Sequence, residues 1–367
     1  MWSRSTASPG TWPRAHPARS SRWSTTSARA CRTPADSAPH NDVQPPAAVT
    51  TTAGGATRWR LVYAASLLAV LAGAYLSLGI GAVPIPLGDL LSPTEDQWRI
   101  LSVARLPRTV AVLLAGAALA VAGMIMQRIT QNSFVSPSTS GTTEAAVLGV
   151  LLATLFLPQV GLVGKMTFAI GTGILGTMVF LHLLHRIRFR DPVVVALVGL
   201  MYGGVIGSVT TFIAYQRDLL QLLEIWSSGS FSSMMAGMYE PLYLVLLVGV
   251  VGYLFADRFT VVGMGREFAV NLGVRYTTIL YTGLVVVSVM AATVVVVVGA
   301  IPFLGLIVPN IVSLFLGDNV RRILPVTALA GAGFVLACDI VGRTLIHPYE
   351  IPVSVVAGVV GAACSSG

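Results

Sequence analysis

Charged side chains are scarce in this sequence: they make up 10% of its 367 residues, while 54% of the residues are hydrophobic. A soluble protein carries charge on about a quarter of its residues, so a lipid bilayer is the expected solvent for most of this chain. Cysteine is rare too. Cys31, Cys338 and Cys364 have no metal-ligand spacing and form no plausible disulfide framework.

Signatures of catalysis are also missing. No G-x-x-x-x-G-K-[ST] sequence occurs, so we do not expect the chain to bind ATP in a P-loop. No Ser–His–Asp arrangement and no pair of carboxylates indicates an enzyme. The net charge of +8 is spread over the breaks between apolar blocks, which is typical of membrane proteins rather than of nucleic-acid binders. We therefore expect no enzymatic activity, no cofactor, no metal and no nucleic-acid partner.

Long apolar blocks separated by short polar breaks fill the chain after Arg58. Each block is about long enough for a helix that crosses roughly 30 Å of hydrocarbon. The predicted fold class is all-α, a polytopic membrane protein with about ten transmembrane helices. The predicted spans are 61–82, 107–127, 138–157, 162–184, 192–214, 241–256, 276–298, 301–316, 325–342 and 351 to the end.

Residues 1–57 differ in composition from everything that follows. They are rich in Ser, Thr, Pro, Ala and Arg, and they hold too few apolar residues to form a core. We predict a disordered tail, for which a transit peptide and a start site placed too far upstream are alternative explanations. Residues 58–367 are predicted to form one transmembrane domain.

Loop charge predicts the orientation of this domain, because basic residues concentrate on cytoplasmic loops. With the N-terminus in the cytoplasm, eleven basic residues fall on inner loops and six on outer ones. The bias favours ten spans with both termini inside. Arg105, Arg108 and Arg343 are exceptions, since they fall at outer helix ends.

The R-L-P-R sequence from Arg105 to Arg108 opens the second predicted span. Pro107 suits the first turn of a helix, and arginines three positions apart share roughly one helix face. Lipid phosphates are one possible partner. Acidic residues of an external protein are the other, because the planar guanidinium binds carboxylates in a bidentate manner. Asp339 and Arg343, four positions apart, form either an internal ion pair or part of the same docking site.

Polar residues between Gln127 and Glu144 pass from one span into the next, around Pro137 and Gly141. Polar backbone at membrane depth is tolerated where it lines a cavity or is buried in protein. Glu144 is either a functional acid inside the membrane or a helix N-terminal acid at the cytoplasmic interface.

Gly199, Gly203 and Gly207 follow one another at intervals of four on the fifth predicted span. Such a stripe allows close helix packing, and it could equally line a moving pathway.

Two segments late in the chain have unusual patterns. Residues 261–274 form a short amphipathic piece bounded by glycines on the cytoplasmic side, which we interpret as a docking element for a soluble partner. In residues 299–322, Pro302 and Pro309 interrupt an apolar run, so a broken or kinked helix is expected.

Together these motifs resemble the permease family of bacterial iron–siderophore, haem and vitamin B12 ATP-binding-cassette (ABC) importers, over roughly residues 60 to 362. The family carries R-L-P-R before a G-x-x-L-x-x-x-G-x-x-x-Q helix, then G-x-I-x-F-x-G-L-x-x-P, and finally an Asp, an Arg and I-P-V. The matching positions here are Arg105–Arg108, Gly116, Leu119, Gly123, Gln127, Gly299, Ile301, Phe303, Gly305, Leu306, Pro309, Asp339, Arg343 and Ile351–Val353.

The resemblance implies a type II importer fold and a non-enzymatic subunit of the bacterial cytoplasmic membrane. It implies two permease subunits, two cytoplasmic ABC ATPases, an external substrate-binding lipoprotein, and alternating access driven by ATP. The binding protein would dock on Arg105, Arg108 and Arg343. The residues assigned to ATPase coupling are Gly263, Gly265, Arg266, Glu267, Ala269, Leu272 and Gly273. Those assigned to the pathway are Gln127, Asn132, Pro137, Gly141, Glu144, Gly199, Gly203, Gly207, Pro309 and Asn310.

Departures from the vitamin B12 importers narrow the predicted substrate. Those proteins read N-P-L-A-x-P and I-P-H, whereas this chain reads N-S-F-V-S-P from Asn132 and V-P-N from Val308. The variants resemble the subgroup for catecholate-type ferric siderophores, which often pairs two different permease chains, so we predict a heterodimer. Haem or vitamin B12 import and a secondary, ion-coupled transporter are the alternatives. The ending A-A-C-S-S-G departs from the family's longer last helix, and a frameshift or a truncated gene model at Ala363 is our hypothesis for it.

Overall fold

Helices account for nearly all of the regular structure in this chain. The structure is a computed structural model that describes residues 54–81, 85–186, 191–346 and 349–365. Within these ranges no β-strand occurs, as the sequence predicts. The α-helices are α1 (Gly54–Gly79), α2 (Glu95–Ile100), α3 (Leu106–Thr130), α4 (Thr142–Phe156), α5 (Leu162–Arg186), α6 (Pro192–Gln216), α7 (Leu220–Ser227), α8 (Tyr243–Leu254), α9 (Ala256–Gly263), α10 (Arg266–Asn271), α11 (Tyr276–Val297), α12 (Leu304–Leu316), α13 (Val320–Thr344) and α14 (Val353–Ser365).

Each of the ten predicted apolar blocks coincides with a helix. Among the described residues six helices are long and apolar enough to cross a membrane, and α8 with α9 forms a seventh candidate span that bends by 59°. The apolar helices α4, α12 and α14 are shorter. The chain is thus a multi-pass membrane protein, while the count of ten spans stays a prediction.

The predicted tail lies mostly outside the described residues, because the description begins at Gly54. Helix α1 starts there, four positions before the boundary drawn at Arg58. The tail and the domain boundary therefore remain predictions.

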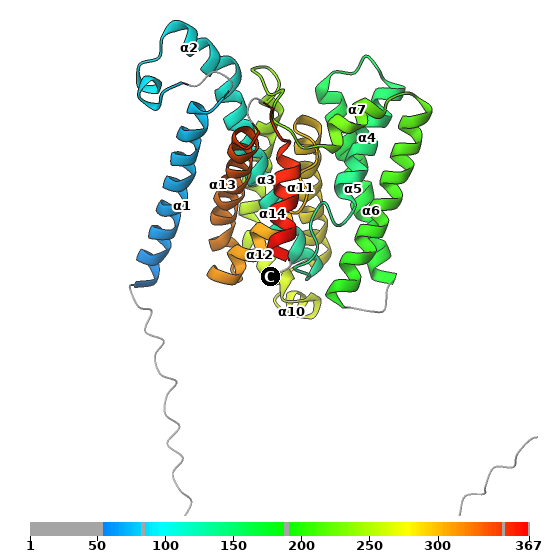
Figure 1. Cartoon of the computed structure of the whole chain (residues 1–367). Helices are drawn as coiled ribbons and strands as arrows, with labels where there is room; N and C mark the ends of the chain where they lie inside the picture. Colours follow the sequence, from blue (N-terminus) through cyan, green and yellow to red (C-terminus); the bar gives the residue numbers. More distant parts are fainter. Residues whose placement is uncertain (1–53, 82–84, 187–190, 347–348, 366–367) are drawn as a thin grey trace, which may run out of the picture. The chain divides into compact units, whose positions relative to one another are not determined.

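Helix α3 runs through the middle of the bundle, and α11 and α13 pack beside it (Figure 1). The 3₁₀ segment η1 (Leu87–Leu91) precedes α2, and the π-helical turn η2 (Leu101–Arg105) joins α2 to α3. Pro107 falls in the first turn of α3, as predicted. Helix α3 ends at Thr130 and is followed by the C-cap residue Gln131, whose φ of 53° is left-handed. Helices α4 to α7 lie on one side of this centre, and α1 lies on the other (Figure 1).

Two glycines allow other helices to approach α3 at backbone distance. A Cβ atom on Gly116 would lie 2.5 Å from the carbonyl oxygen of Gly331 on α13. A Cβ atom on Gly123 would lie 1.9 Å from the carbonyl oxygen of Gly305 on α12. Without a hydrophobic force between helices in lipid, such close packing is a main source of helix association.

The predicted helix break in 299–322 is present, and its place is now defined. The chain turns at Gly299 and Phe303, with left-handed φ values of 99° and 62°, and α12 begins at Leu304. Pro309 lies inside α12 rather than at a break. A proline cannot bond the carbonyl four residues earlier, which here is Gly305, and that carbonyl faces Gly123.

Candidate functional site

An ion cluster joins α3 to α13 at the N-terminal end of α3. The Arg108 guanidinium donates to Asp339 Oδ1 from 2.8 Å, and it also donates to both oxygens of Glu350, at 3.0 and 2.9 Å. Asp339 Oδ2 lies 2.6 Å from Nη2 of Arg343, an ion-pair contact without hydrogen-bond angles. The Asp339 side chain is fully buried, so its charge is balanced by two arginines rather than by water.

Two of the predicted docking arginines hold the end of α1. Arg343 donates to the carbonyl oxygen of Ile80 at 2.8 Å and to that of Ser77 at 3.2 Å. Arg105 donates to the carbonyl oxygen of Leu78. The last carbonyls of a helix lack intrahelical partners, so these guanidinium groups satisfy the C-terminal end of α1 and fasten it to α3 and α13.

Exposure distinguishes the three arginines that the sequence groups together. Arg105 and Arg343 are buried, with 8% and 7% of their surface accessible. Arg108 keeps 15% of its side chain exposed, and its partner Glu350 keeps 35%. The Arg108–Glu350 pair is therefore the part of this cluster that an external carboxylate could reach.

The predicted coupling segment forms a separate short helix. Gly265 (φ 118°) and Gly273 (φ 74°) flank α10 in backbone conformations that favour glycine. A Cβ atom on Gly263 would lie 3.3 Å from the Arg128 side chain, and Gln131 donates to the carbonyl oxygen of Val262 at 3.1 Å. These contacts hold α9 and α10 against the C-terminal end of α3.

The surface of α10 is apolar and exposed. Phe268 on α10 and its flanking residues Met264 and Leu272 each expose at least 60% of their surface, whereas Ala269 is fully buried against the bundle. Arg266 and Glu267 are also exposed. A helix with one buried alanine and several exposed large apolar residues, at the end of a bundle, fits a protein interface.

The arginine cluster and α10 lie at opposite ends of the same helix. Arg105 directly precedes α3, and Gln131 directly follows it. Twenty-five residues at about 1.5 Å each separate the two ends by roughly 37 Å. Figure 1 shows the same relationship, with α10 at the end of the bundle away from α2.

The polar segment after α3 is buried in protein. Asn132 donates to the carbonyl oxygen of Pro192 at 2.9 Å, and Asn310 on α12 donates to that of Ser133 at 3.0 Å. Gln127 donates to the carbonyl oxygen of Leu306 at 3.3 Å. Pro137 and Gly141 are buried as well. These pathway candidates, together with the buried Pro309, therefore pack α3, α6 and α12 against the loop.

The predicted glycine stripe on α6 is closely packed at one end and open at the other. A Cβ atom on Gly199 would lie 2.2 Å from the carbonyl oxygen of Thr139, so this end packs closely. A Cβ atom on Gly203 would lie 3.4 Å from the Glu144 carboxylate. Gly207 has nothing within 4 Å and lines an open groove.

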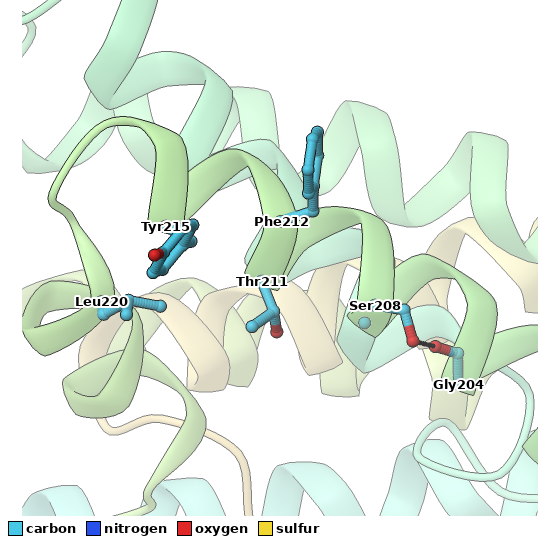
Figure 2. A pocket seen from close by; sticks show the side chains of 7 residues that line it. Gly204, Ser208, Thr211, Phe212, Tyr215 and Leu220 are labelled. Atoms are coloured by element: carbon cyan, nitrogen blue, oxygen red, sulfur yellow. Dashed lines mark hydrogen bonds between the residues drawn. The ribbon is translucent and has the colours of Figure 1, made fainter.

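The groove beside Gly207 has a volume of about 680 Å³. Figure 2 shows the side chains of Thr211 and Tyr215 along α6 and of Leu220 at the start of α7. Ser208 donates to the carbonyl oxygen of Gly204 at 2.8 Å, drawn as a dashed line in Figure 2. The groove thus combines apolar walls with hydroxyl groups.

Glu144 lies in the first turn of α4, next to Gly203 on α6. One of its oxygens, Oε2, is buried and has no hydrogen-bond partner among the described residues. None of the other pathway candidates carries a positive charge, so none of them forms an ion pair with Glu144. Glu144 is therefore separate from the arginine cluster.

Sequence reasoning overlooked several residues of these sites. Glu350 follows Arg343 in the sequence, and no sequence pattern marks it as a partner of Arg108. Ser208, Thr211 and Tyr215 could have been found, because they continue the Gly207 face at helical spacing. No group of three His, Cys, Asp or Glu side chains in the described part of the chain could hold a metal ion.

A helical membrane bundle, with a short exposed helix near one end of α3 and a buried ion cluster at the other, is the kind of fold found in transport permeases. The chain belongs to the FecCD transport family, which residues 67–364 match. The fold resembles a solved inward-facing structure of an ABC transporter assigned to the metal-chelate type. That structure aligns with a TM-score of 0.70 at 25% identity, over 84% of this chain and 98% of the other.

Sequence relatives are similar over most of their length. The chain is 42% identical to the petrobactin import system permease protein YclN of Bacillus subtilis, over 82% of this chain and 95% of the relative. It is 45% identical to the petrobactin import system permease protein FatD of Bacillus anthracis, over 73% of this chain and 80% of the relative. The resemblance to this permease family is thereby confirmed.

Proposed function

We propose that this chain is one membrane-spanning subunit of an ATP-driven importer for an iron–siderophore complex of the petrobactin kind. The observation that carries the proposal is the similarity to two petrobactin import permeases over most of their length. The catecholate-type subgroup suggested by the sequence motifs supports the same substrate class. Haem and vitamin B12 are the alternative cargoes that the family resemblance leaves open.

The exposed face of α10 is the proposed docking site for a cytoplasmic ABC ATPase. Met264, Phe268 and Leu272 offer an apolar contact, and Arg266 and Glu267 offer charged ones beside it. The glycines at both ends of α10 would allow the helix to dock on the ATPase as one rigid unit. ATP hydrolysis would then take place on the partner, and α9 with α3 would transmit its motion into the bundle.

The opposite end is the proposed docking site for an external substrate-binding lipoprotein. Arg108 is the accessible cation there, and a carboxylate of the binding protein would replace Glu350 on it. Arg105 and Arg343 support this site from beneath by holding α1. With the lipoprotein outside, α10 and both chain termini face the cytoplasm of a bacterium, and the bundle spans its cytoplasmic membrane.

The groove beside Gly207 is the proposed wall of the translocation pathway. A second permease subunit would close it on the other side, and we propose a heterodimer, as in the subgroup that the motifs resemble. Hydroxyl groups of Ser208, Thr211 and Tyr215 would face the passing complex. No covalent chemistry on the substrate is needed, because alternating access alone moves it.

The test is transport by the reassembled complex in proteoliposomes. The chain, its partner permease and the ATPase are reconstituted, and binding protein loaded with iron-labelled petrobactin is added outside. Uptake should require ATP on the ATPase side and persist when an ionophore removes ion gradients. Uptake that continues without the ATPase and stops with the ionophore would establish a secondary transporter instead. ATP-dependent uptake of labelled haem or vitamin B12, with no uptake of iron-labelled petrobactin, would overturn the proposed substrate.

A further inference from the structure

An apolar groove of about 400 Å³ lies between α1 and α13, away from the sites described above. The two helices run side by side in Figure 1. Most of the groove's lining residues have small or aliphatic side chains. They are Ser66, Ala69, Val70, Gly73, Leu329, Ala330, Gly333, Leu336, Ala337 and Ile340.

The two helices come close together at two glycines, and the groove lies beside these contacts. A Cβ atom on Gly73 would lie 3.0 Å from the Leu336 side chain, and one on Gly333 would lie 3.5 Å from Val70. Ala69 and Ala337, by contrast, are exposed and line the groove. The helices therefore touch through some positions and leave a furrow at others. In the membrane, hydrocarbon rather than water fills an apolar furrow.

Polar and aromatic groups gather at one mouth of the groove. Tyr63 on α1 donates its hydroxyl to the carbonyl oxygen of Arg322 on α13 at 2.6 Å, and the Trp59 ring lies 5.9 Å from the Tyr63 ring. Aromatic residues of this kind are typical of the headgroup level of a bilayer. Arg58 is exposed at the same end of α1.

Arg322 is exposed and lies on the groove face of α13. It precedes Leu329 by seven residues and Ile340 by five helical turns, so these residues share one face of α13. Among the described residues, the guanidinium groups of Arg58 and Arg322 have no hydrogen-bond or ion-pair partner, whereas neighbouring Arg321 pairs with Asp257. Arg60 lies about 130° around α1 from the centre of the groove face, at 100° per residue.

The length of the groove matches one lipid leaflet. From Leu329 to Ile340 the lining extends over eleven residues, or roughly 16 Å, and half of the hydrocarbon core measures about 15 Å. A helix, about 10 Å across with its side chains, does not fit into a furrow of this volume. An acyl chain does, and the glycerol and ester groups of the lipid would bridge the roughly 10 Å between Leu329 and Arg322, so that the phosphate reaches the unpaired arginines.

We propose that one anionic glycerophospholipid binds between α1 and α13, with an acyl chain in the groove and its phosphate on Arg322 and Arg58. Basic pockets between transmembrane helices on the cytoplasmic side bind such headgroups in membrane proteins. The lipid would fix α1, which is otherwise exposed along most of its length. This site depends on neither the substrate nor the ATPase of the proposed importer.

Native mass spectrometry of the purified full-length chain tests the proposal. Phosphatidylglycerol and phosphatidylcholine with the same two C16 chains are added separately, and the lipid retained after detergent removal is counted. One phosphatidylglycerol should be retained about tenfold over phosphatidylcholine, and Arg58→Gln with Arg322→Gln should reduce this preference to about twofold or less. Arg60→Gln, which removes the same charge from another face, should leave the preference intact.

A groove-filling variant checks the acyl-chain position. Ala69→Phe with Ala337→Phe should remove the retained lipid, and because both alanines are exposed, thermal unfolding should stay near that of the unchanged chain. Equal retention of the two lipids by the unchanged protein would identify ordinary annular lipid and overturn the proposal. Selective retention that survives either the phenylalanine pair or the glutamine pair would also overturn it.

Discussion

Arg108 on α3 and Asp339 on α13, 231 positions apart in the sequence, meet at 2.8 Å at the N-terminal end of α3. Arg343 approaches the other oxygen of the same carboxylate, so one buried acid holds two arginines. Breaking a buried ion pair by removing one partner costs far more than breaking an exposed one.

We expect Asp339→Asn to lower the free energy of unfolding by about 3–5 kcal/mol, because two guanidinium groups lose their counter-charge. Thermal unfolding of the detergent-solubilised chain measures the effect. Asp318→Asn is the matched control, since Asp318 is 79% exposed in its pair with Arg128 and should contribute less than about 1 kcal/mol. Equal effects of the two substitutions would contradict a structural role for the Asp339 cluster.

Substitutions of Arg108 and of Glu350 should have opposite effects on the affinity of the binding protein for the importer. Arg108→Gln should weaken association at least tenfold because a charge-assisted contact is lost, a change of about 1.4 kcal/mol or more. Glu350→Gln should strengthen association, because a competing carboxylate is removed. Affinity measured on the assembled importer checks both, and Arg99→Gln, also exposed at this end on α2, controls for general loss of positive charge. Weaker association in Glu350→Gln would mean that Glu350 itself faces the partner.

Gly123→Ala should destabilise the chain, because its Cβ atom would lie 1.9 Å from a backbone oxygen of Gly305. Backbone cannot rotate aside as a side chain does, so we expect a loss of about 1–3 kcal/mol. Gly204→Ala, where nothing lies within 4 Å, should be neutral or slightly stabilising. Thermal unfolding compares the two, and a stable Gly123→Ala protein would refute the close α3–α12 packing.

Phe268→Asp should reduce binding of the ATPase at least tenfold, because a charge would enter a desolvated apolar contact. Co-purification with the ATPase at several concentrations measures the change. Leu91→Asp likewise replaces an exposed apolar residue by a charge, in the segment before α2 (85% accessible, against 61% for Phe268), and it should leave ATPase binding unchanged. If both variants bind normally, α10 is not the docking element.

The sequence predicted where the helices lie in the chain better than it predicted which helices contact one another. Continuous apolar blocks marked the helices because a span needs about twenty apolar residues, whatever its neighbours. The motifs around Gly123 and Gly305 were identified separately, yet nothing in one sequence shows that each glycine is the space the other requires. The break at Phe303 was assigned to the prolines, whereas left-handed backbone creates it and Pro309 stays helical.

The arginines illustrate the limit for the site. Their position at helix ends was visible in the charge pattern, but their exposure depends on which carbonyls and carboxylates the fold brings to them. Arg105 and Arg343 donate hydrogen bonds to carbonyl oxygens at the end of α1. That segment lies more than 20 residues before Arg105 and more than 200 before Arg343. Periodicity within one helix carries no such information.

Glu144 separates the proposed mechanism from its ion-coupled alternative. An ion-driven transporter needs an intramembrane carboxylate that gains and loses a proton or cation in each cycle. Asp339 is unsuited because both of its carboxylate oxygens are engaged by arginines, which leaves Glu144, with its unpaired buried oxygen, as the candidate. Glu144→Gln keeps the shape of the side chain and removes its titration. If ATP drives transport, uptake in proteoliposomes should stay within about twofold of the unchanged protein, with the same dependence on the ATPase. A loss of uptake in Glu144→Gln, with ATPase binding and thermal unfolding unchanged, would instead make this carboxylate part of the energy coupling.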